Sequence, residues 1–169
     1  KITNWKDRNT CVLFGDGAGA ALVTAAEKGS DRGILASHLA ADGSGAGVLS
    51  RPAGGTRTPF VEGTTTPEST LLYMDGRKVY YFAVGVLGKT IEILLEKAGM
   101  SLDDIDFIVP HQANVRIIDA CAKRLSIPME KFYMNIEEFA NTSAASIPIA
   151  LTDMSRKGIL KAGHVILTV

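Results

Sequence analysis

The sequence predicts an α/β fold in which helices cover a largely parallel sheet. The first indication is the order of patterns after residue 73, where helical and strand-like segments alternate three times. Strands joined in this way through helices pair in parallel and carry the helices on the faces of the sheet. The second indication is the unbroken apolar run at residues 107–109, with the apolar Ile105 before it, which is typical of a strand buried on both faces. The chain has 169 residues, 46% of them hydrophobic and 21% charged, which is enough to bury a core.

The strand predicted at residues 105–109 ends at Pro110 and is followed directly by His111. Proline cannot extend the hydrogen-bond ladder of a sheet, so His111 is expected just past the carboxyl end of this strand. Ligands of open α/β sheets bind at that edge, because loops converge there above a rigid sheet. The sequence therefore predicts a polar site at His111.

Two strand-like runs at residues 10–14 and 20–25 flank the sequence Gly15-Asp-Gly-Ala-Gly19. We expect these runs to form a glycine-rich hairpin, with a third strand near residues 33–39. The glycine spacing differs from the GxGxxG of dinucleotide-binding loops, and the segment after it is strand-like. A phosphate cradle needs a helix N-terminus, so a turn is favoured over a phosphate site.

Residues 42–70 are rich in Gly, Thr and Pro, and their composition predicts no regular element. Loops of this length within compact domains are usually lids, binding loops or mobile segments. A surface excursion without functional consequence remains open as the alternative.

The long pattern beginning near Val79 predicts the best-defined helix, which should end at Gly99. A second helix follows Asn114, and a third follows Asn141 and should end near Gly158. A short strand at residues 132–134 and another at residues 163–169 complete the alternation. The apolar face of the first helix is expected to comprise Val79, Phe82, Val86, Ile91, Leu94 and Leu95, and that of the second Val115, Ile118, Ala122 and Leu125.

Charge and composition exclude several classes of function. The 18 basic and 18 acidic residues give no net charge, so no broad field favours nucleic acid or a membrane surface. Cys11 and Cys121 are far apart and form no metal-ligand motif, which favours two buried thiols in a reducing compartment. No apolar run is long enough to span a bilayer and no targeting signal is evident. We therefore expect a cytoplasmic protein without a metal, a membrane partner or a nucleic-acid partner.

Two motifs together resemble one enzyme family. They are Val109-Pro-His-Gln-Ala-Asn114 and Asn141-Thr-Ser-Ala-Ala-Ser146, and upstream Asp7-Arg8 with Thr10-Cys-Val-Leu-Phe-Gly-Asp-Gly-Ala-Gly-Ala20 agrees with them. In these segments the chain resembles β-ketoacyl-acyl carrier protein synthase III, which starts bacterial-type fatty acid synthesis. The resemblance covers the whole chain, but the chain corresponds only to the carboxyl-side half of that enzyme.

The resemblance implies a thiolase-like fold, in which two similar βα halves form one unit with mixed, mostly parallel sheets. Residues 1–41 would end the first half and residues 42–73 would form a mobile loop beside the substrate entrance. Residues 74–169 would form most of the second half, without the family's final glycine-rich segment. The fold would therefore be incomplete in this chain, which would lack much of the first half of the duplicated unit.

The resemblance also implies a reaction, the decarboxylative Claisen condensation of acyl-CoA, with acetyl-CoA the expected primer, and malonyl-acyl carrier protein. A cysteine thiolate takes the acyl group, malonyl loses CO2, and the resulting enolate attacks to give 3-oxoacyl-acyl carrier protein. By resemblance His111 and Asn141 are the catalytic pair, and neutral N–H donors of these kinds suit an enolate oxygen. No cofactor is implied, because acyl-CoA is a substrate.

The family's nucleophilic cysteine stands at a helix N-terminus, where its pKa is lowered. Cys11 lies in a predicted strand and Cys121 within a predicted helix, so neither has that position. We therefore expect the nucleophile to lie outside this chain, and the isolated chain to be inactive.

Other positions are implied by the resemblance alone. Asn114 corresponds to a residue near the pantetheine arm, and Gly76 and Tyr80 correspond to positions that line the CoA entrance. The carrier-protein contact corresponds to Gln112, Ala113, Asn114, Val115 and Arg116, with the Arg116 guanidinium as the main acid-binding group. The implied partners are acyl carrier protein, acyl-CoA, the enzyme's own amino-terminal half and a second copy in a homodimer, to which residues 10–14 could contribute.

Alternatives remain at this point. A related condensing enzyme with polyketide or branched primers would carry the same two motifs. A non-catalytic module that binds CoA or carrier protein is the second alternative, and a plain structural domain the third. If each residue is considered alone, His111 is expected to be a structural residue and Asn141 a helix cap or a glycosylation site. His38 and His164 lack a motif, and we expect structural or surface roles for them.

Overall fold

A computed structural model describes residues 2–30 and 32–169 of the chain. The chain divides into two compact units, one made of Lys1–Phe14 with Ala40–Ala83 and the other of Gly15–Leu39 with Val84–Val169. Helix α1 (Gly76–Ala98) begins in the first unit and ends in the second.

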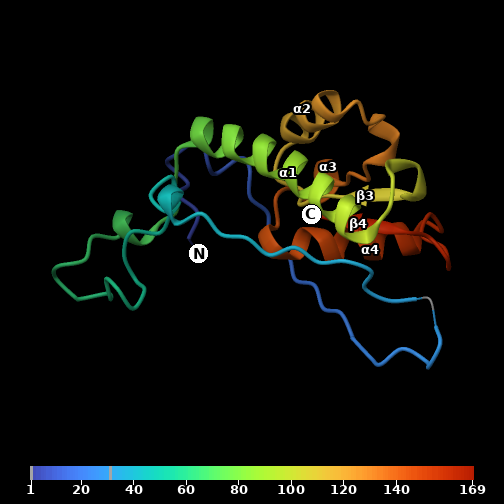
Figure 1. The fold of residues 1–169 in the computed structure, drawn as a ribbon. Coiled ribbons are helices and arrows are strands. Elements are labelled where there is room, and N and C mark those ends of the chain that lie inside the picture. Colours follow the sequence, from blue (N-terminus) through green and yellow to red (C-terminus); the bar gives the residue numbers. More distant parts are fainter. Residues whose placement is uncertain (1, 31) are drawn as a thin grey trace. The chain divides into compact units, whose positions relative to one another are not determined.

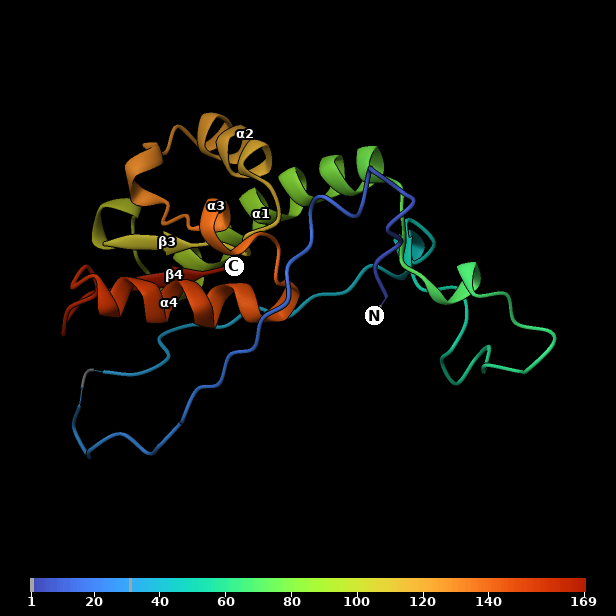
Figure 2. The same cartoon turned by 180° about the vertical axis from the view of Figure 1, so that it is seen from behind.

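The second unit contains a parallel two-stranded sheet with helices on both faces. Strand β3 (Phe107–Val109) pairs in parallel with β4 (Ile166–Thr168), and a single parallel bridge joins Ile108 to Phe132. Figures 1 and 2 show α2 and the later part of α1 on one side of this sheet and α4 on the other. The predicted α/β architecture is therefore confirmed. The remaining helices of the unit are α2 (Val115–Leu125), α3 (Ile136–Phe139) and α4 (Ser146–Arg156), with 3-10 turns at Leu102–Asp104, Met129–Lys131 and Ser143–Ala145.

The sheet is held by apolar contacts on both faces. Val109 of β3 is completely buried with Ala150 and Met154 of α4. Ile108, whose side chain points to the opposite face from that of Val109, is also completely buried. On that side of the sheet α1 approaches α2 closely at Gly88, where an added Cβ would lie 3.8 Å from the Cys121 Sγ. Burial on both faces explains why the β3 sequence is continuously apolar.

The helix ends follow the signals in the sequence. Gly99 has φ +63 and its N–H donates to the Glu96 carbonyl, so it ends α1 as predicted. The Asn114 side chain accepts from the Arg116 N–H and caps the start of α2. Helix α4 ends at Arg156, two residues before Gly158, close to the predicted end.

The predicted apolar faces were partly wrong. Phe82 and Val86 of α1 and Val115 of α2 are exposed, while the deeply buried positions of α1 are Leu87, Gly88 and Ile91. The α2 positions that pack inward are Ile117, Ile118, Cys121 and Ala122. Ile91, Ile118 and Ala122 are buried as predicted, so the buried faces overlap the predicted ones and differ at neighbouring positions. The strand predicted at 132–134 is reduced to the bridge at Phe132.

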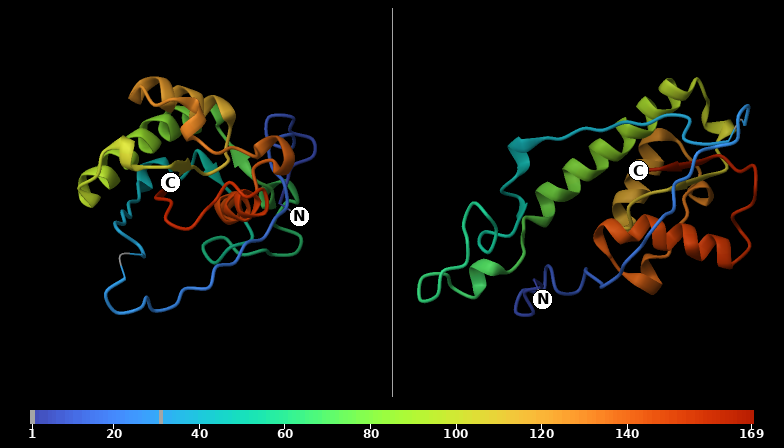
Figure 3. Two further views of the ribbon diagram at one scale, coloured as in Figure 1. Left: turned by 90° about the vertical axis from the view of Figure 1, so that its right-hand side faces the viewer. Right: turned by 90° about the horizontal axis from the view of Figure 1, so that it is seen from below.

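The hairpin predicted for residues 10–25 and the strand predicted at 33–39 are wrong. Residues 10–13 form turns, and the described residues 15–30 and 32–39 contain no strand. Figures 1 and 3 show residues 15–30 and 32–39 as extended chain. Leu22 and Leu39 are 92% and 96% exposed. Strand-like composition marks a segment suited to a sheet, but a strand also needs a neighbouring ladder.

The glycines of Gly15–Gly19 serve close packing and form no turn. A Cβ on Gly15 would lie 2.6 Å from the Phe139 carbonyl oxygen, and one on Gly19 would overlap the Pro148 ring. The segment therefore passes too close to the residues around the start of α4 to carry side chains at these positions.

The first unit contains two short strands before α1. Strand β1 (Leu49–Ser50) pairs antiparallel with β2 (Tyr73–Met74), and 3-10 turns lie at Gly43–Gly45 and Glu68–Thr70. The prediction that residues 42–70 hold no regular element was therefore wrong at β1. In the described part of the chain, no helix combines the length and apolar character needed to cross a membrane.

The close packing of Gly17 gives a test of this arrangement. In Gly17→Ala the new methyl carbon would lie 2.8 Å from Ile149 Cδ1 and 2.9 Å from Thr142 Cγ2. We expect the free energy of unfolding to fall by ~1–3 kcal/mol, as in other overpacked sites. Urea unfolding of the protein would measure this. Gly47→Ala, where a Cβ meets no atom within 4 Å, serves as the control, and equal stability of the two variants would contradict the packing.

Candidate active site

His111 is fixed at the edge of the sheet by its backbone. Its N–H donates to the Val169 carbonyl at 2.6 Å, and its own carbonyl accepts from the Ala113 N–H at 2.8 Å. Val169 directly follows β4, so the ends of both strands determine where His111 lies. The structure confirms the predicted position just past β3.

The His111 imidazole contacts the first turn of α4. Its Nδ1 lies 2.7 Å from the Ser146 Oγ, and the Gln112 N–H donates to the same oxygen at 3.3 Å. Ser146 is 2% exposed and is the first residue of α4. The imidazole borders an open hollow of about 250 Å³ that is lined by His111, Ser143, Ala144, Ser146 and Ile147.

Partial removal from water lowers the pKa of His111 below its ordinary value. Desolvation disfavours the imidazolium, so the neutral ring predominates near neutral pH. A neutral imidazole has one N–H donor and one acceptor nitrogen. The site therefore presents a polar hydrogen-bonding ring in place of a cation.

The Asn141 side chain is held by a hydrogen bond from the backbone. Its Oδ1 accepts from the Ser143 N–H at 2.9 Å, which leaves the Nδ2 group as the donor. The adjacent backbone is unusual, because Ala140 has φ 58 and Ser143 has φ 55. Positive φ at such residues costs energy and is concentrated at functional sites. Ser143 both binds Asn141 and lines the hollow beside His111, so the two predicted residues belong to one neighbourhood.

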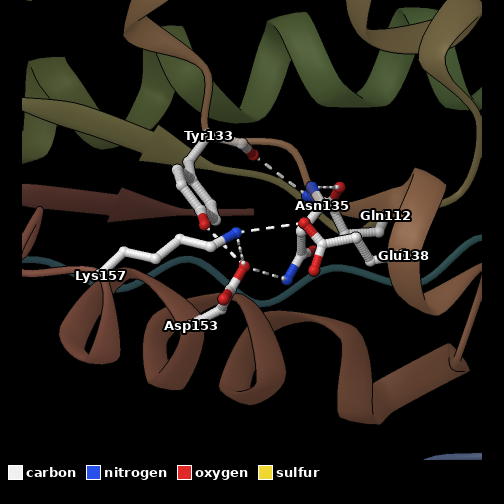
Figure 4. Close-up of polar contacts among 6 residues, drawn as sticks. All are labelled: Gln112, Tyr133, Asn135, Glu138, Asp153 and Lys157. Carbon is white, nitrogen blue, oxygen red and sulfur yellow. Dashed lines mark hydrogen bonds and ion pairs between the residues drawn. The ribbon is translucent and has the colours of Figure 1, made fainter.

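Gln112 lies in the interior beside this site. It is 1% exposed, its Nε2 donates to the carbonyls of Pro110 (2.9 Å) and Tyr133 (3.2 Å), and its Oε1 accepts from the Asn135 N–H at 3.1 Å. Figure 4 shows the side chain between these segments. By resemblance Gln112 belongs to the carrier-protein contact, and in the structure its side chain joins the loop after β3 to residues 133–135.

A second part of the network was not anticipated from the sequence. The Asp153 Oδ2 accepts from the Tyr133 hydroxyl at 2.7 Å, from Lys157 Nζ at 2.9 Å and from Asn135 Nδ2 at 3.3 Å (Figure 4). The hydrogen bond from Tyr133, followed by that from Lys157, lowers the pKa of Asp153. The only signal in the sequence is the spacing of four residues between Asp153 and Lys157.

The remaining residues of the predicted carrier contact are more accessible. Ala113 and Asn114 are half-buried, and Val115 and Arg116 are exposed. Among the described residues, the Arg116 guanidinium has no ion pair. This leaves one cation available at the start of α2.

Gly76 and Tyr80 belong to the first unit. Gly76 is the exposed first residue of α1, and Tyr80 is half-buried with its ring edge-to-face with Tyr81, 5.7 Å between centroids. The Asp75 side chain accepts from the Lys78 N–H at 3.2 Å and so stabilises this helix start.

Neither cysteine has the environment of a nucleophile. Cys121 is fully buried within α2, and burial raises the pKa of its thiol. Cys11 is partly exposed in a turn, where its N–H donates to the Asp7 carbonyl at 2.9 Å. Neither is at a helix N-terminus, as expected. Within residues 2–30 and 32–169, no three His, Cys, Asp or Glu side chains gather as a metal site would require.

Gln112→Ala tests whether the interior amide supports the site. The change would remove three hydrogen bonds and leave buried backbone groups without partners, so we expect a loss of about 2–3 kcal/mol in the free energy of unfolding. Urea unfolding of the protein measures the loss. Glu92→Ala removes a side chain of equal length from an exposed position of α1 and should change little. If Gln112→Ala were as stable as this control, the network would not support the fold.

Comparison with known proteins agrees with this geometry. The family described as "3-Oxoacyl-[acyl-carrier-protein (ACP)] synthase III C terminal" matches residues 95–169, and "3-Oxoacyl-[acyl-carrier-protein (ACP)] synthase III" matches residues 1–43. A β-ketoacyl-[acyl-carrier-protein] synthase III of Caldanaerobacter subterraneus is 51% identical over 169 residues, covering 100% of this chain and 50% of the relative. The enzyme of Symbiobacterium thermophilum is 46% identical over the same length, 51% of its own.

Solved structures give the same result. The 3-oxoacyl-[acyl-carrier-protein] synthase III of Aquifex aeolicus matches with a TM-score of 0.83 at 42% identity, covering 99% of this chain and 49% of that one. The enzyme of Pseudomonas aeruginosa matches with a TM-score of 0.85 at 35% identity and the same coverage. The chain spans about half the length of the curated relatives it matches. With the sheet, the rim histidine and both family regions in agreement, the chain belongs to the 3-oxoacyl-[acyl-carrier-protein] synthase III family and corresponds to its carboxyl-side half.

Proposed function

We propose that the protein catalyses the decarboxylative Claisen condensation of an acyl-CoA, with acetyl-CoA as the primer, and malonyl-acyl carrier protein. The product is 3-oxoacyl-acyl carrier protein, the first intermediate of fatty acid synthesis. One observation supports this most directly. His111 and Asn141 each have one polar atom already bonded, His111 Nδ1 to Ser146 and Asn141 Oδ1 to the Ser143 N–H. This arrangement leaves one nitrogen of each side chain for a substrate.

The reaction needs donors where negative charge develops. When malonyl loses CO2, the electron pair of the broken C–C bond moves onto the thioester carbonyl oxygen as an enolate. The enolate carbon then bonds to the acyl carbon, and the cysteine thiolate departs. Neutral N–H groups of His111 and Asn141 would stabilise the enolate oxygen, and the lowered pKa of His111 suits a neutral donor.

In this proposal, the nucleophilic cysteine is not one of the 169 residues of this chain. The burial and raised pKa of Cys121 argue against a thiolate there. The site needs no cofactor, because acyl-CoA delivers an activated acyl group. The protein would act in the cytoplasm with its own amino-terminal half, as a homodimer.

Substrate contacts follow from the family correspondence. Gly76 and Tyr80 would line the CoA entrance, and Asn114 would lie near the pantetheine arm. Acyl carrier protein would contact Ala113, Asn114, Val115 and Arg116, with Gln112 supporting this segment from the interior. The exposure of Arg116 supports its role, because a guanidinium can bind acidic side chains or a phosphate.

The two proposed donors can be tested in the protein as expressed from its native gene. We expect His111→Ala and Asn141→Ala each to lower malonyl decarboxylation by about 10²–10³-fold, while acyl transfer from CoA to the cysteine continues. Release of radiolabelled CO2 and acylation measured by intact mass separate the two steps. His38→Ala removes a histidine outside this site and should leave both steps unchanged. Normal condensation by either donor variant would remove that residue from the mechanism.

Arg116→Ala tests the carrier contact. We expect KM for malonyl-acyl carrier protein to rise about tenfold, because one charge-assisted contact is lost, with kcat and the KM for acyl-CoA little changed. Steady-state kinetics at two ionic strengths would measure this, and the effect should shrink at high salt. Arg156→Ala changes the same charge at an exposed position of α4 and serves as the control. A KM for the carrier substrate equal to that of this control would exclude Arg116 from the contact.

A second candidate is a condensing enzyme that primes polyketide synthesis. The priming β-ketosynthase of the R1128 polyketide pathway matches with a TM-score of 0.64 at 35% identity, over 75% of this chain. The same two donors would serve that reaction. Comparison of kcat/KM for acetyl-CoA with that for longer and branched acyl-CoAs discriminates the two candidates.

A further inference from the structure

We propose that the Ser146 hydroxyl is a positioning group that holds neutral His111 in the tautomer with its proton on Nε2. The contact that carries this proposal is the 2.7 Å approach of Ser146 Oγ to His111 Nδ1. In a short hydrogen bond between a hydroxyl and an imidazole nitrogen, either group can be the donor. The direction determines which nitrogen carries the proton, and hence whether Nε2 is a donor or an acceptor.

The acceptor available to the single Ser146 hydroxyl proton decides the direction. The Gln112 N–H donates to the Ser146 Oγ at 3.3 Å, so that oxygen already acts as an acceptor. A serine hydroxyl has a single proton to donate. Among the described residues, His111 Nδ1 is the only acceptor within hydrogen-bond distance of that proton. The hydroxyl therefore donates to Nδ1, and the ring proton resides on Nε2.

The reverse arrangement leaves an unsatisfied group. If Nδ1 carried the proton and donated to Ser146, the hydroxyl proton would have no acceptor among the described residues, in a side chain that is 2% exposed. A buried donor without a partner is strongly disfavoured, and we expect the Nε2–H tautomer to exceed the other by about tenfold or more. The 2.6 Å bond from the His111 N–H to Val169 and the burial of Ser146 keep the two groups in register.

This tautomer determines which nitrogen of the His111 ring can donate to a ligand. With Nδ1 occupied by a protein hydroxyl, Nε2–H is the one donor of the ring left for a molecule in the adjacent hollow. The catalytic consequence rests on the proposed function, in which an enolate oxygen needs a donor from His111. A ring with its proton on Nδ1 would direct a lone pair at that oxygen and oppose the reaction.

The tautomer can be measured without any activity. Nitrogen-15 spectra of the labelled protein, recorded well above the ordinary histidine pKa of about 6.5, distinguish protonated from unprotonated ring nitrogens. We expect the native His111 to show an unprotonated Nδ1 and a protonated Nε2, and Ser146→Ala to show shifts of mixed tautomers. Ser146→Thr retains the hydroxyl and should restore the native spectrum. Ser155→Ala, at an exposed position of the same helix, should leave the spectrum unchanged.

Either of two results would overturn the proposal. One is a native His111 with its proton on Nδ1, and the other is an unchanged single tautomer in Ser146→Ala. The native spectrum alone decides the first, even where the alanine variant fails to fold. In the kinetic arm, Ser146→Ala should lower kcat for decarboxylation about tenfold with little change in KM, and Ser146→Thr should recover it. If the native protein performs no condensation, the proposed function fails while the spectra still decide the role of Ser146.

Discussion

The packing of α4 against β3 is the contact on which the rest of the second unit depends. Ser146, Ala150 and Met154 are buried at intervals of four residues, so they form one stripe along α4. Val109 lies opposite Ala150 and Met154 in the same buried cluster. His111 is two residues beyond Val109, and Ser146 is one helical turn before Ala150. The apolar contact therefore aligns the two polar groups at the end of the stripe. A change that slides α4 along the sheet would separate Ser146 from His111 before it exposed the core.

The sequence predicted the elements whose signals are local and redundant. Strand β3 has a continuous apolar run closed by Pro110, and α1 has a long periodic pattern closed by Gly99. The position of His111 follows from the first of these. Its partner was not predictable, because the contact with Ser146 joins residues 35 positions apart. The interior contacts of Gln112 were not predictable for a related reason, since only the fold reveals its three interior partners.

Errors elsewhere arose where local preference needs a distant partner. Residues 20–25 and 33–39 have the composition of strands, yet no ladder forms within the described chain. The glycines at 15, 17 and 19 indicated a turn, whereas they allow the backbone to approach Phe139, Thr142 and Pro148. In both cases, glycine and β-branched residues do not by themselves determine the local structure. The same composition serves a turn, a strand or a close contact, and the distinction lies in what packs against it.

The exposed extended segment affects the tendency of the chain to aggregate. Leu22, Val23, Ile34 and Leu39 are largely exposed on backbone without a strand partner. Such a segment offers unpaired N–H and C=O groups together with apolar side chains, the combination from which edge-to-edge aggregation starts. With no net charge to keep molecules apart, the colloidal stability of the chain near neutral pH depends on covering this segment. A stretch remote in sequence from His111 and Asn141 would therefore influence the solubility of the chain.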